Sequence, residues 1–214
     1  MRARVKYSKG EEVKYVGHLD TMRTFIRCIK RSAIPVEFSK GFNPRVQISF
    51  ALPLGVGLTS NSEYFDLVVK DKMNETMFLG ELNSVLPQGF KALHVDFLEE
   101  DNKKSLMSLV KEANYAITLE GNLDSSAIES LLKKEEILIE KESNGNHKIS
   151  QINLKDYLIE WSVETKEQGK ILVTVHATAG SNNNLNPNFV VQAIEKYVGK
   201  VDDFEIHRKE LILK

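Results

Sequence analysis

Residues 38–57 read FSKGFNPRVQISFALPLGVG, and this stretch decides the fold of the first half of the chain. Three glycines and two prolines interrupt it, which argues against a helix. Its middle, Val46–Leu52, alternates apolar residues in the manner of a strand with one buried face. Gly41 and Pro44 precede this strand and predict a stiffened turn in a ligand-facing loop.

The chain before this stretch predicts a strand and a helix. In residues 2–8, Ala3, Val5 and Tyr7 alternate with cations, which is typical of a half-buried strand. Residues 18–35 predict a helix that Pro35 ends. Its predicted core stripe comprises Leu19, Met22, Phe25, Ile26 and Ile29.

The chain after it predicts a strand at 62–71, a helix at 74–87 with Asn74 as N-cap, and a strand at 89–100. With Val46–Leu52 as the second strand, the order is strand, helix, strand, strand, helix, strand. That order is the split βαβ, ferredoxin-like arrangement, an antiparallel sheet with two helices on one face.

The second half repeats the pattern in a decorated form. Asn144-Gly145 predicts a hairpin turn, and residues 186–199 predict a helix capped by Asn186, with Pro187 in its first position. We therefore expect an α+β protein of two ferredoxin-like sandwiches in tandem, both with antiparallel sheets. The predicted ranges are a basic domain at 1–100, a linker at 101–112 and a second domain at 113–214.

Composition excludes several classes of protein. The chain has 214 residues, 42% of them apolar, which suffices for a packed core. One cysteine, Cys28, excludes an internal disulfide and a cysteine-built cluster. No window of eighteen uncharged apolar residues occurs, and the N-terminus has no signal-peptide pattern, so we expect a cytoplasmic protein with no membrane span.

Charge is distributed unevenly along the chain. Residues 1–50 contain eleven Lys or Arg against four Asp or Glu, a net of +7, whereas the remainder has a net of −8. This asymmetry indicates an anionic partner for the first segment, such as nucleic acid or phosphate, or else charge complementarity between the two halves.

A cationic surface is the main functional candidate. Four cations share the polar face of the predicted helix 18–35, namely Arg23, Arg27, Lys30 and Arg31. Backbone N–H groups in the Gly-Phe-Asn-Pro turn suit phosphate or carboxylate, and an aromatic ring there suits stacking on a base. A solvated helix face and a loop held by packing are the alternative. The predicted ligand-binding residues are His18, Arg23, Arg27, Arg31, Ser39, Lys40, Gly41, Phe42, Asn43 and Arg45.

His18 lies where the first loop enters the predicted helix and is the one histidine in the basic half. It is either a proton donor or phosphate contact, or an ordinary loop histidine. The five histidines show no metal-ligand spacing, and the common nucleotide, protease and hydrolase fingerprints are absent. We therefore predict no metal site, no cofactor and no catalytic residue.

Several spaced motifs agree with one family. They are Gly17-His18-Leu19-Asp20, Ile34-Pro35-Val36, residues 38–44, residues 48–56 and Ser62-Glu63-Tyr64. Over residues 15–66 the chain resembles the radical-SAM-linked protein family, a bacterial domain of unknown function. The end of the chain is similar to the family's closing helix and strand, which adds Arg208 to the predicted ligand-binding residues. Asn186 and Arg45-Val46 depart from the family pattern.

The resemblance implies an accessory role beside a radical SAM protein, either as a stand-alone chain or as a C-terminal extension of a cobalamin-binding one. It also implies an RNA-related substrate. A radical SAM enzyme needs three cysteines for its cluster, so a chain with one cysteine is not the radical enzyme itself.

Three functions follow as hypotheses. The first is a non-catalytic module that binds RNA or another phosphate-bearing ligand for a radical SAM partner. The second is a metal-independent RNA-processing endoribonuclease, by fold analogy, with His18 and Lys40 as the acid–base pair. The third is a protein-interaction adaptor that uses the acidic second half.

Overall fold

The computed structural model describes residues 1–99, 105–142, 149–180 and 183–214. It divides into two compact units, of which the first is Met1–Lys111 with Arg208–Lys214 and the second is Glu112–His207. The predicted second domain, 113–214, includes the last seven residues, so the described structure assigns the end of the chain differently. The predicted Asn144-Gly145 turn and part of the predicted linker lie outside the described residues.

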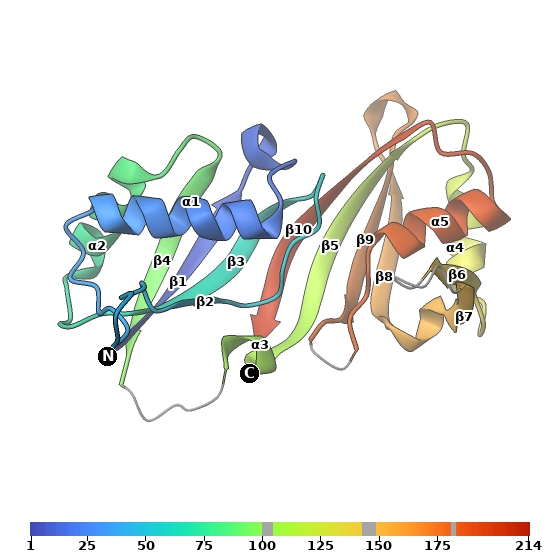
Figure 1. Cartoon of the computed structure of the whole chain (residues 1–214). Coiled ribbons are helices and arrows are strands. Elements are labelled where there is room, and N and C mark those ends of the chain that lie inside the picture. The colour runs from blue at the N-terminus through green and yellow to red at the C-terminus, as the bar shows by residue number, and fades with distance from the viewer. Residues whose placement is uncertain (100–104, 143–148, 181–182) are drawn as a thin grey trace. The chain divides into compact units, whose positions relative to one another are not determined.

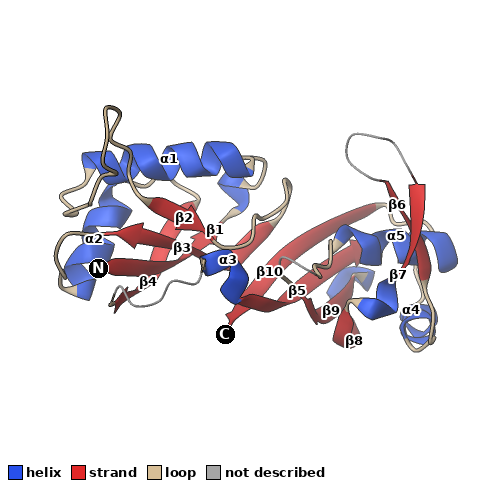
Figure 2. Cartoon of the chain, turned by 60° about the horizontal axis from the view of Figure 1, so that its bottom comes forward, coloured by secondary structure: helices blue, strands red, loops and turns tan. Residues whose placement is uncertain are grey.

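The first unit has the predicted order of elements. They are β1 (Arg2–Lys9), α1 (His18–Arg31), β2 (Ile48–Phe50), β3 (Thr59–Val68), α2 (Glu75–Val85) and β4 (Phe90–Leu98), with the short helices η1 (Glu11–Val13) and α3 (Leu106–Leu109) in addition. The strands pair antiparallel in the order β4-β1-β3, and β2 pairs with β3. Figures 1 and 2 show α1 and α2 on one face of these strands. This is the ferredoxin-like order, so the prediction is confirmed.

The core of the first unit lies between this sheet and its helices. Ala3, Val5 and Tyr7 point inward from β1 and are buried, as predicted. Phe25 of α1 packs on Tyr7 and Phe65, with ring centroids 4.8 and 5.2 Å apart. Aromatic packing of this kind fixes α1 over the middle of the sheet.

The predicted core stripe of α1 is wrong at one residue. Phe25 and Ile29 are buried and Met22 and Ile26 are half-buried, but Leu19 is 65% exposed. Leu19 lies in the first turn of the helix. Periodicity predicts the direction of a side chain around the helix axis, and it does not show whether neighbouring elements cover that turn.

The second strand is shorter than predicted. Of Val46–Leu52, only Ile48–Phe50 is β2. Val46 forms a bridge with Phe38, and Leu52 lies in the loop that leads to β3. The stretch 38–57 therefore folds as a hairpin, a short strand and a loop.

The second unit repeats the arrangement with an inserted hairpin. Its elements are β5 (Val110–Glu120), α4 (Ser125–Leu132), β6 (Leu138–Glu142), β7 (Ile149–Asn153), η2 (Leu154–Asp156), β8 (Leu158–Thr165), η3 (Glu167–Gly169), β9 (Ile171–Thr178), α5 (Asn188–Tyr197) and the first part of β10 (Asp203–Leu213). The sheet order is β10-β5-β9-β8, while β6 and β7 pair with each other. Without β6 and β7 the order of elements is again ferredoxin-like, so the α+β prediction holds in both units.

α5 begins at Asn188 with Pro187 as its N-cap, one residue later than predicted, and Asn186 accepts a hydrogen bond from the backbone N–H of Asn188 at 3.2 Å. None of the helices in the described ranges is both long enough and apolar enough to cross a membrane.

Candidate functional site

A closed hairpin carries most of the predicted ligand-binding loop. Phe38 and Val46 form a bridge at its base. The N–H of Ser39 donates to the carbonyl of Arg45 at 2.8 Å, and the N–H of Arg45 donates to Ser39 Oγ at 3.0 Å. Gly41 has a φ of 122°, which only glycine adopts without strain. The hairpin 38–46 is therefore a preformed loop with a defined tip.

The tip of this hairpin presents an aromatic ring to solvent. Phe42 has a relative exposure of 106%, so no described residue covers it. Lys40, Asn43 and Arg45 are also exposed. An exposed phenylalanine ring gains no free energy from burial within the protein. A ligand with a π-face would cover the ring by stacking on it.

The exposed face of α1 adds further cations. Phe25 and Ile29 face the sheet, so Arg23, Arg27 and Lys30 lie on the solvent side of the helix. Arg23 pairs with Asp20 at 2.9 Å, and both side chains are exposed, so water weakens that pair.

Arg31 is held by the neighbouring helix. Its Nη2 donates to the carbonyl of Val85 at 3.2 Å and to Cys28 Sγ at 3.3 Å. Val85 is the last residue of α2, where a cation satisfies a free carbonyl. Arg31 is therefore less available to a ligand than the other cations of α1.

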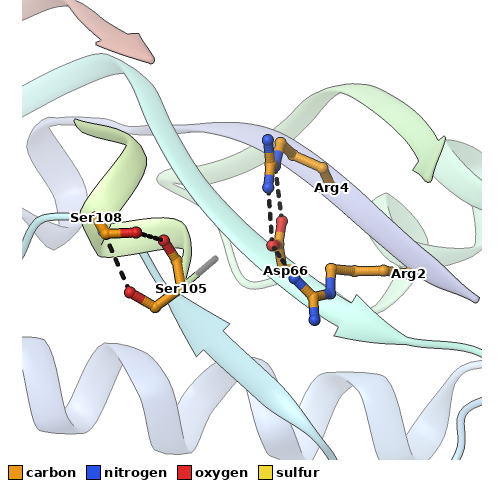
Figure 3. Close-up of polar contacts among 5 residues, drawn as sticks. All are labelled: Arg2, Arg4, Asp66, Ser105 and Ser108. Carbon is orange, nitrogen blue, oxygen red and sulfur yellow. Dashed lines mark hydrogen bonds and ion pairs between the residues drawn. The ribbon is translucent and has the colours of Figure 1, made fainter. Parts of the chain in front are cut away.

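Two cations of β1, Arg2 and Arg4, lie on the opposite face of the sheet from α1. Arg4 Nε and Nη2 donate to the two oxygens of Asp66 at 2.8 and 3.0 Å, and Arg2 Nη1 lies 3.5 Å from the same carboxylate. Figure 3 shows both guanidinium groups directed at Asp66, near the capped turn Ser105–Ser108. Their charge is used within the unit.

The cations of residues 1–50 therefore fall into two groups, those whose side chains have a partner and those whose side chains have none. Among the residues that the structure describes, the side chains of Arg27, Lys30, Lys40 and Arg45 form no ion pair or hydrogen bond. All four belong to α1 or to the hairpin 38–46. Cations that need not break an internal pair are the ones that bind phosphate at the lowest cost.

His18 is the first residue of α1 and is half-buried. Its ring meets Phe50 edge-on, with centroids 5.8 Å apart. Burial, together with the nearby charge of Lys9, lowers the pKa of His18 below its usual 6.5. The imidazole is therefore neutral at pH 7 and adds no charge for an anion. No described contact joins His18 to Lys40.

Arg208 takes part in a buried ion pair. Its Nη1 lies 2.9 and 3.0 Å from the two carboxylate oxygens of Glu63 and 3.4 Å from the carbonyl of Leu52. Arg208 and Glu63 are each 3% exposed. The charge of Arg208 is neutralised inside the first unit, and it stabilises the loop that contains Leu52.

Burial shifts the titration of the groups around this pair. It raises the pKa of Glu63, while Arg208, a hydrogen bond from Ser60 and the charge of Lys9 act in the opposite direction. Burial lowers the pKa of Lys9 and raises the pKa of Tyr7 well above its usual value. The inner face of β1 and β3 therefore carries a cluster of ionisable side chains under α1.

Sequence reasoning missed Lys9 and Glu63 as partners in this cluster. The alternation of the strand could have predicted the burial of Lys9, because Lys9 continues the inward series of Ala3, Val5 and Tyr7. Lys9 Nζ donates to the carbonyls of Lys14 and Val16 at 3.2 and 2.7 Å, which fixes the loop before α1. Within the described ranges, no three His, Cys, Asp or Glu side chains group as metal ligands.

Comparison with solved structures identified chains with a similar fold. A chain in the crystal structure of a Cbf5-Nop10-Gar1 complex is 11% identical with a TM-score of 0.50, over 98% of this chain and 48% of that chain. This chain thus spans about half the length of that one, and the likeness concerns the fold alone. The crystal structure of an unknown protein from Galdieria sulphuraria is 14% identical over 97% of each chain, with a TM-score of 0.26.

No curated protein matched the sequence. Residues 2–187 match the family described as "Uncharacterized protein conserved in bacteria (DUF2344)". Because this match covers most of its length, the chain belongs to the DUF2344 family of uncharacterized bacterial proteins.

Proposed function

We propose that the chain is a non-catalytic accessory protein that binds single-stranded RNA with the hairpin 38–46 and the exposed face of α1. The observation that carries this proposal is the fully exposed ring of Phe42 between two exposed cations, Lys40 and Arg45. Stacking needs a base that is not already stacked in a duplex, which favours a single strand.

Each part of this surface has a separate physical role. Phe42 gains contact with one base face, a contribution of about 1–3 kcal/mol per base. Lys40 and Arg45 at the hairpin, with Arg27 and Lys30 on α1, replace the counterions of the phosphates. None of these contacts reads a base edge, so we expect little sequence preference.

A salt titration with and without Phe42 tests the proposal. Fluorescence anisotropy with unstructured RNA should show tight binding at low salt. If all four unpaired cations contact phosphates, the logarithm of the affinity should fall with the logarithm of salt concentration at a slope of about −3. Phe42→Ala should weaken binding about five- to a hundredfold without changing the slope.

The matched control is Phe204→Ala, which removes an exposed ring of the second unit. It should leave RNA affinity unchanged. Absence of binding by the unaltered protein at low salt, or equal loss from both variants, would contradict the proposal.

A radical SAM enzyme is the proposed partner. The support for it is the resemblance of residues 15–66 to the radical-SAM-linked family, and the single cysteine of these 214 residues supplies at most one of the three that such a cluster needs. The test is to purify the protein with a radical SAM protein encoded beside it and to measure turnover of an RNA substrate. Turnover should fall when the hairpin carries Phe42→Ala and should be retained with Phe204→Ala.

A further inference from the structure

Three large apolar side chains are exposed near the N-terminal end of α1. Tyr15, Leu19 and Val56 are 74%, 65% and 60% exposed. The loops that carry Tyr15 and Val56 lie against each other. A Cβ on Gly57 would be 3.9 Å from Tyr15 Cε1, and one on Gly17 would be 4.0 Å from Val56 Cγ2. Exposed apolar side chains that gather in this way mark a binding surface.

Buried polar contacts hold Tyr15 in place. Lys9 Nζ donates to the carbonyls of Lys14 and Val16, the residues on either side of Tyr15. The N–H of Gly57 donates to the same Lys14 carbonyl at 2.9 Å. The backbone that carries the ring is therefore fixed, and a ligand that covers the ring has little ordering entropy to overcome.

The Tyr15 ring also attracts positive charge. The ammonium of Lys14 lies 5.5 Å from the ring centroid, as in a cation–π contact. Lys14 also pairs with Glu11 at 2.8 Å, so its charge is partly offset and the ring supplies the main contact for a ligand. A base has the planar face that stacks on such a ring.

The cations of α1 connect this surface with the hairpin 38–46. Arg23, Arg27 and Lys30 follow one another at four and three residues, so they form one stripe along the helix. Asp20 offsets part of the charge of Arg23. The stripe starts beside Leu19, and the hairpin follows the opposite end of α1 in the chain.

We propose that Tyr15 is a second stacking site, so that one RNA strand runs along α1 with a base on Tyr15, another on Phe42 and phosphates on the cations between them. This inference rests on the proposed function. The 14 residues of α1 span about 20 Å, which corresponds to about six nucleotides at about 3.4 Å each, or fewer in an extended strand.

The experiment measures affinity against RNA length. Oligouridylates from the dinucleotide to the dodecanucleotide are titrated with the full chain, because uridine strands have no structure of their own. Affinity should rise steeply up to about the hexanucleotide and then level off. Tyr15→Ala should remove this rise and weaken binding of the longer strands by about tenfold, whereas Tyr15→Phe should keep both.

A second readout locates the bases directly. Oligonucleotides with a 5-iodouridine at each end are photocrosslinked, and the modified peptides are identified by mass spectrometry. Hexanucleotides and longer strands should crosslink at both Tyr15 and Phe42, and dinucleotides should crosslink at one of the two per molecule.

The outcomes separate this inference from the function on which it rests. If the unaltered protein binds no RNA, both fail. If it binds RNA and Phe42→Ala weakens binding, but Tyr15→Ala has no effect at any length and no crosslink forms at Tyr15, only the second stacking site is overturned. The apolar surface would then be assigned to a protein partner.

Discussion

Glu63 and Arg208 form a buried ion pair in the first unit. Both are buried on the inner face of the sheet, and two oxygens of Glu63 accept from one nitrogen of Arg208. Burial alone favours the protonated form of Glu63, and Arg208 provides the largest opposing influence on its pKa. Removing Arg208 would leave a carboxylate buried without its countercharge.

We expect Arg208→Met to lower the free energy of unfolding by about 3–5 kcal/mol near pH 7. Without the guanidinium the pKa of Glu63 rises further. A carboxyl group whose pKa is raised on folding contributes stability that is present at low pH and is lost as pH rises through the folded pKa. The deficit of the variant should therefore narrow as pH falls. Urea unfolding from pH 4 to 8 measures both effects.

Lys209→Met is the control, because Lys209 is the exposed neighbour of Arg208 on β10. It should change stability by less than about 0.5 kcal/mol. An Arg208→Met deficit that does not depend on pH would contradict the coupling to Glu63.

Single residues also show where sequence reasoning stops. The alternation of Ala3, Val5 and Tyr7 predicts their burial correctly, since strand parity is a local property. The contact between Glu63 and Arg208 joins residues 145 positions apart, and no local pattern records it. Phe42 is predicted as a ligand contact because it lies in a predicted turn. Its full exposure could not be predicted, since it depends on whether other parts of the first unit cover the ring.

The hairpin 38–46 is the element on which the candidate site depends. Its base is closed by the Phe38–Val46 bridge and the two hydrogen bonds between Ser39 and Arg45. Its tip turns at Gly41, in a conformation outside the range of L-residues. The sequence predicts a turn here from Gly41 and Pro44, but it also predicts a seven-residue strand where the structure has three residues. Val46, at the start of that stretch, pairs with Phe38 within the hairpin, whereas Ile48–Phe50 pairs with β3. Apolar alternation predicts an extended segment, but it does not show which partner each residue pairs with.

Gly41→Ala should disturb the tip and little else. No heavy atom lies within 4 Å of a Cβ at this position, so the cost is backbone strain without a clash. We expect RNA affinity to fall about threefold or more because Phe42 is displaced. The midpoint of thermal unfolding should change by less than about 3 °C.

Gly80→Ala gives a matched comparison. Gly80 lies in α2 and also has open space around a Cβ, but its backbone is helical. This change should stabilise the protein by about 0.5–1 kcal/mol and leave RNA affinity unaltered. An equal loss of affinity in both variants would show that the tip conformation does not matter.

The chain as a whole leaves its first unit and later returns to it. Residues from Glu112 to His207 form the second unit, and Arg208–Lys214 belong to the first. Sequence patterns predict both ferredoxin-like sets of elements because each set is built from local periodicities. They do not predict this return, since the last strand reads as a continuous alternating segment that serves both units.

A chain that ends at His207 should lose structure mainly in the first unit. It lacks Arg208 and Leu211, which are both buried. Glu63 therefore loses its countercharge, and Ser62 of β3 loses the hydrogen bond from the N–H of Leu211. Hydrogen exchange should show loss of protection in Thr59–Val68 of β3. Protection should persist in Ile171–Thr178 of β9, which pairs with β5 and β8. Equal protection of β3 in both chains would contradict the assignment of the last seven residues.

The late arrival of Arg208 has a consequence for synthesis on the ribosome. Glu63 leaves the exit tunnel long before the guanidinium that neutralises it has been translated, since 144 codons separate the two. Until Arg208 has been translated, the nascent first unit must hold an uncharged, proton-bearing Glu63 or keep that end of its sheet open. Completion of the first unit is thereby tied to the synthesis of the last part of β10.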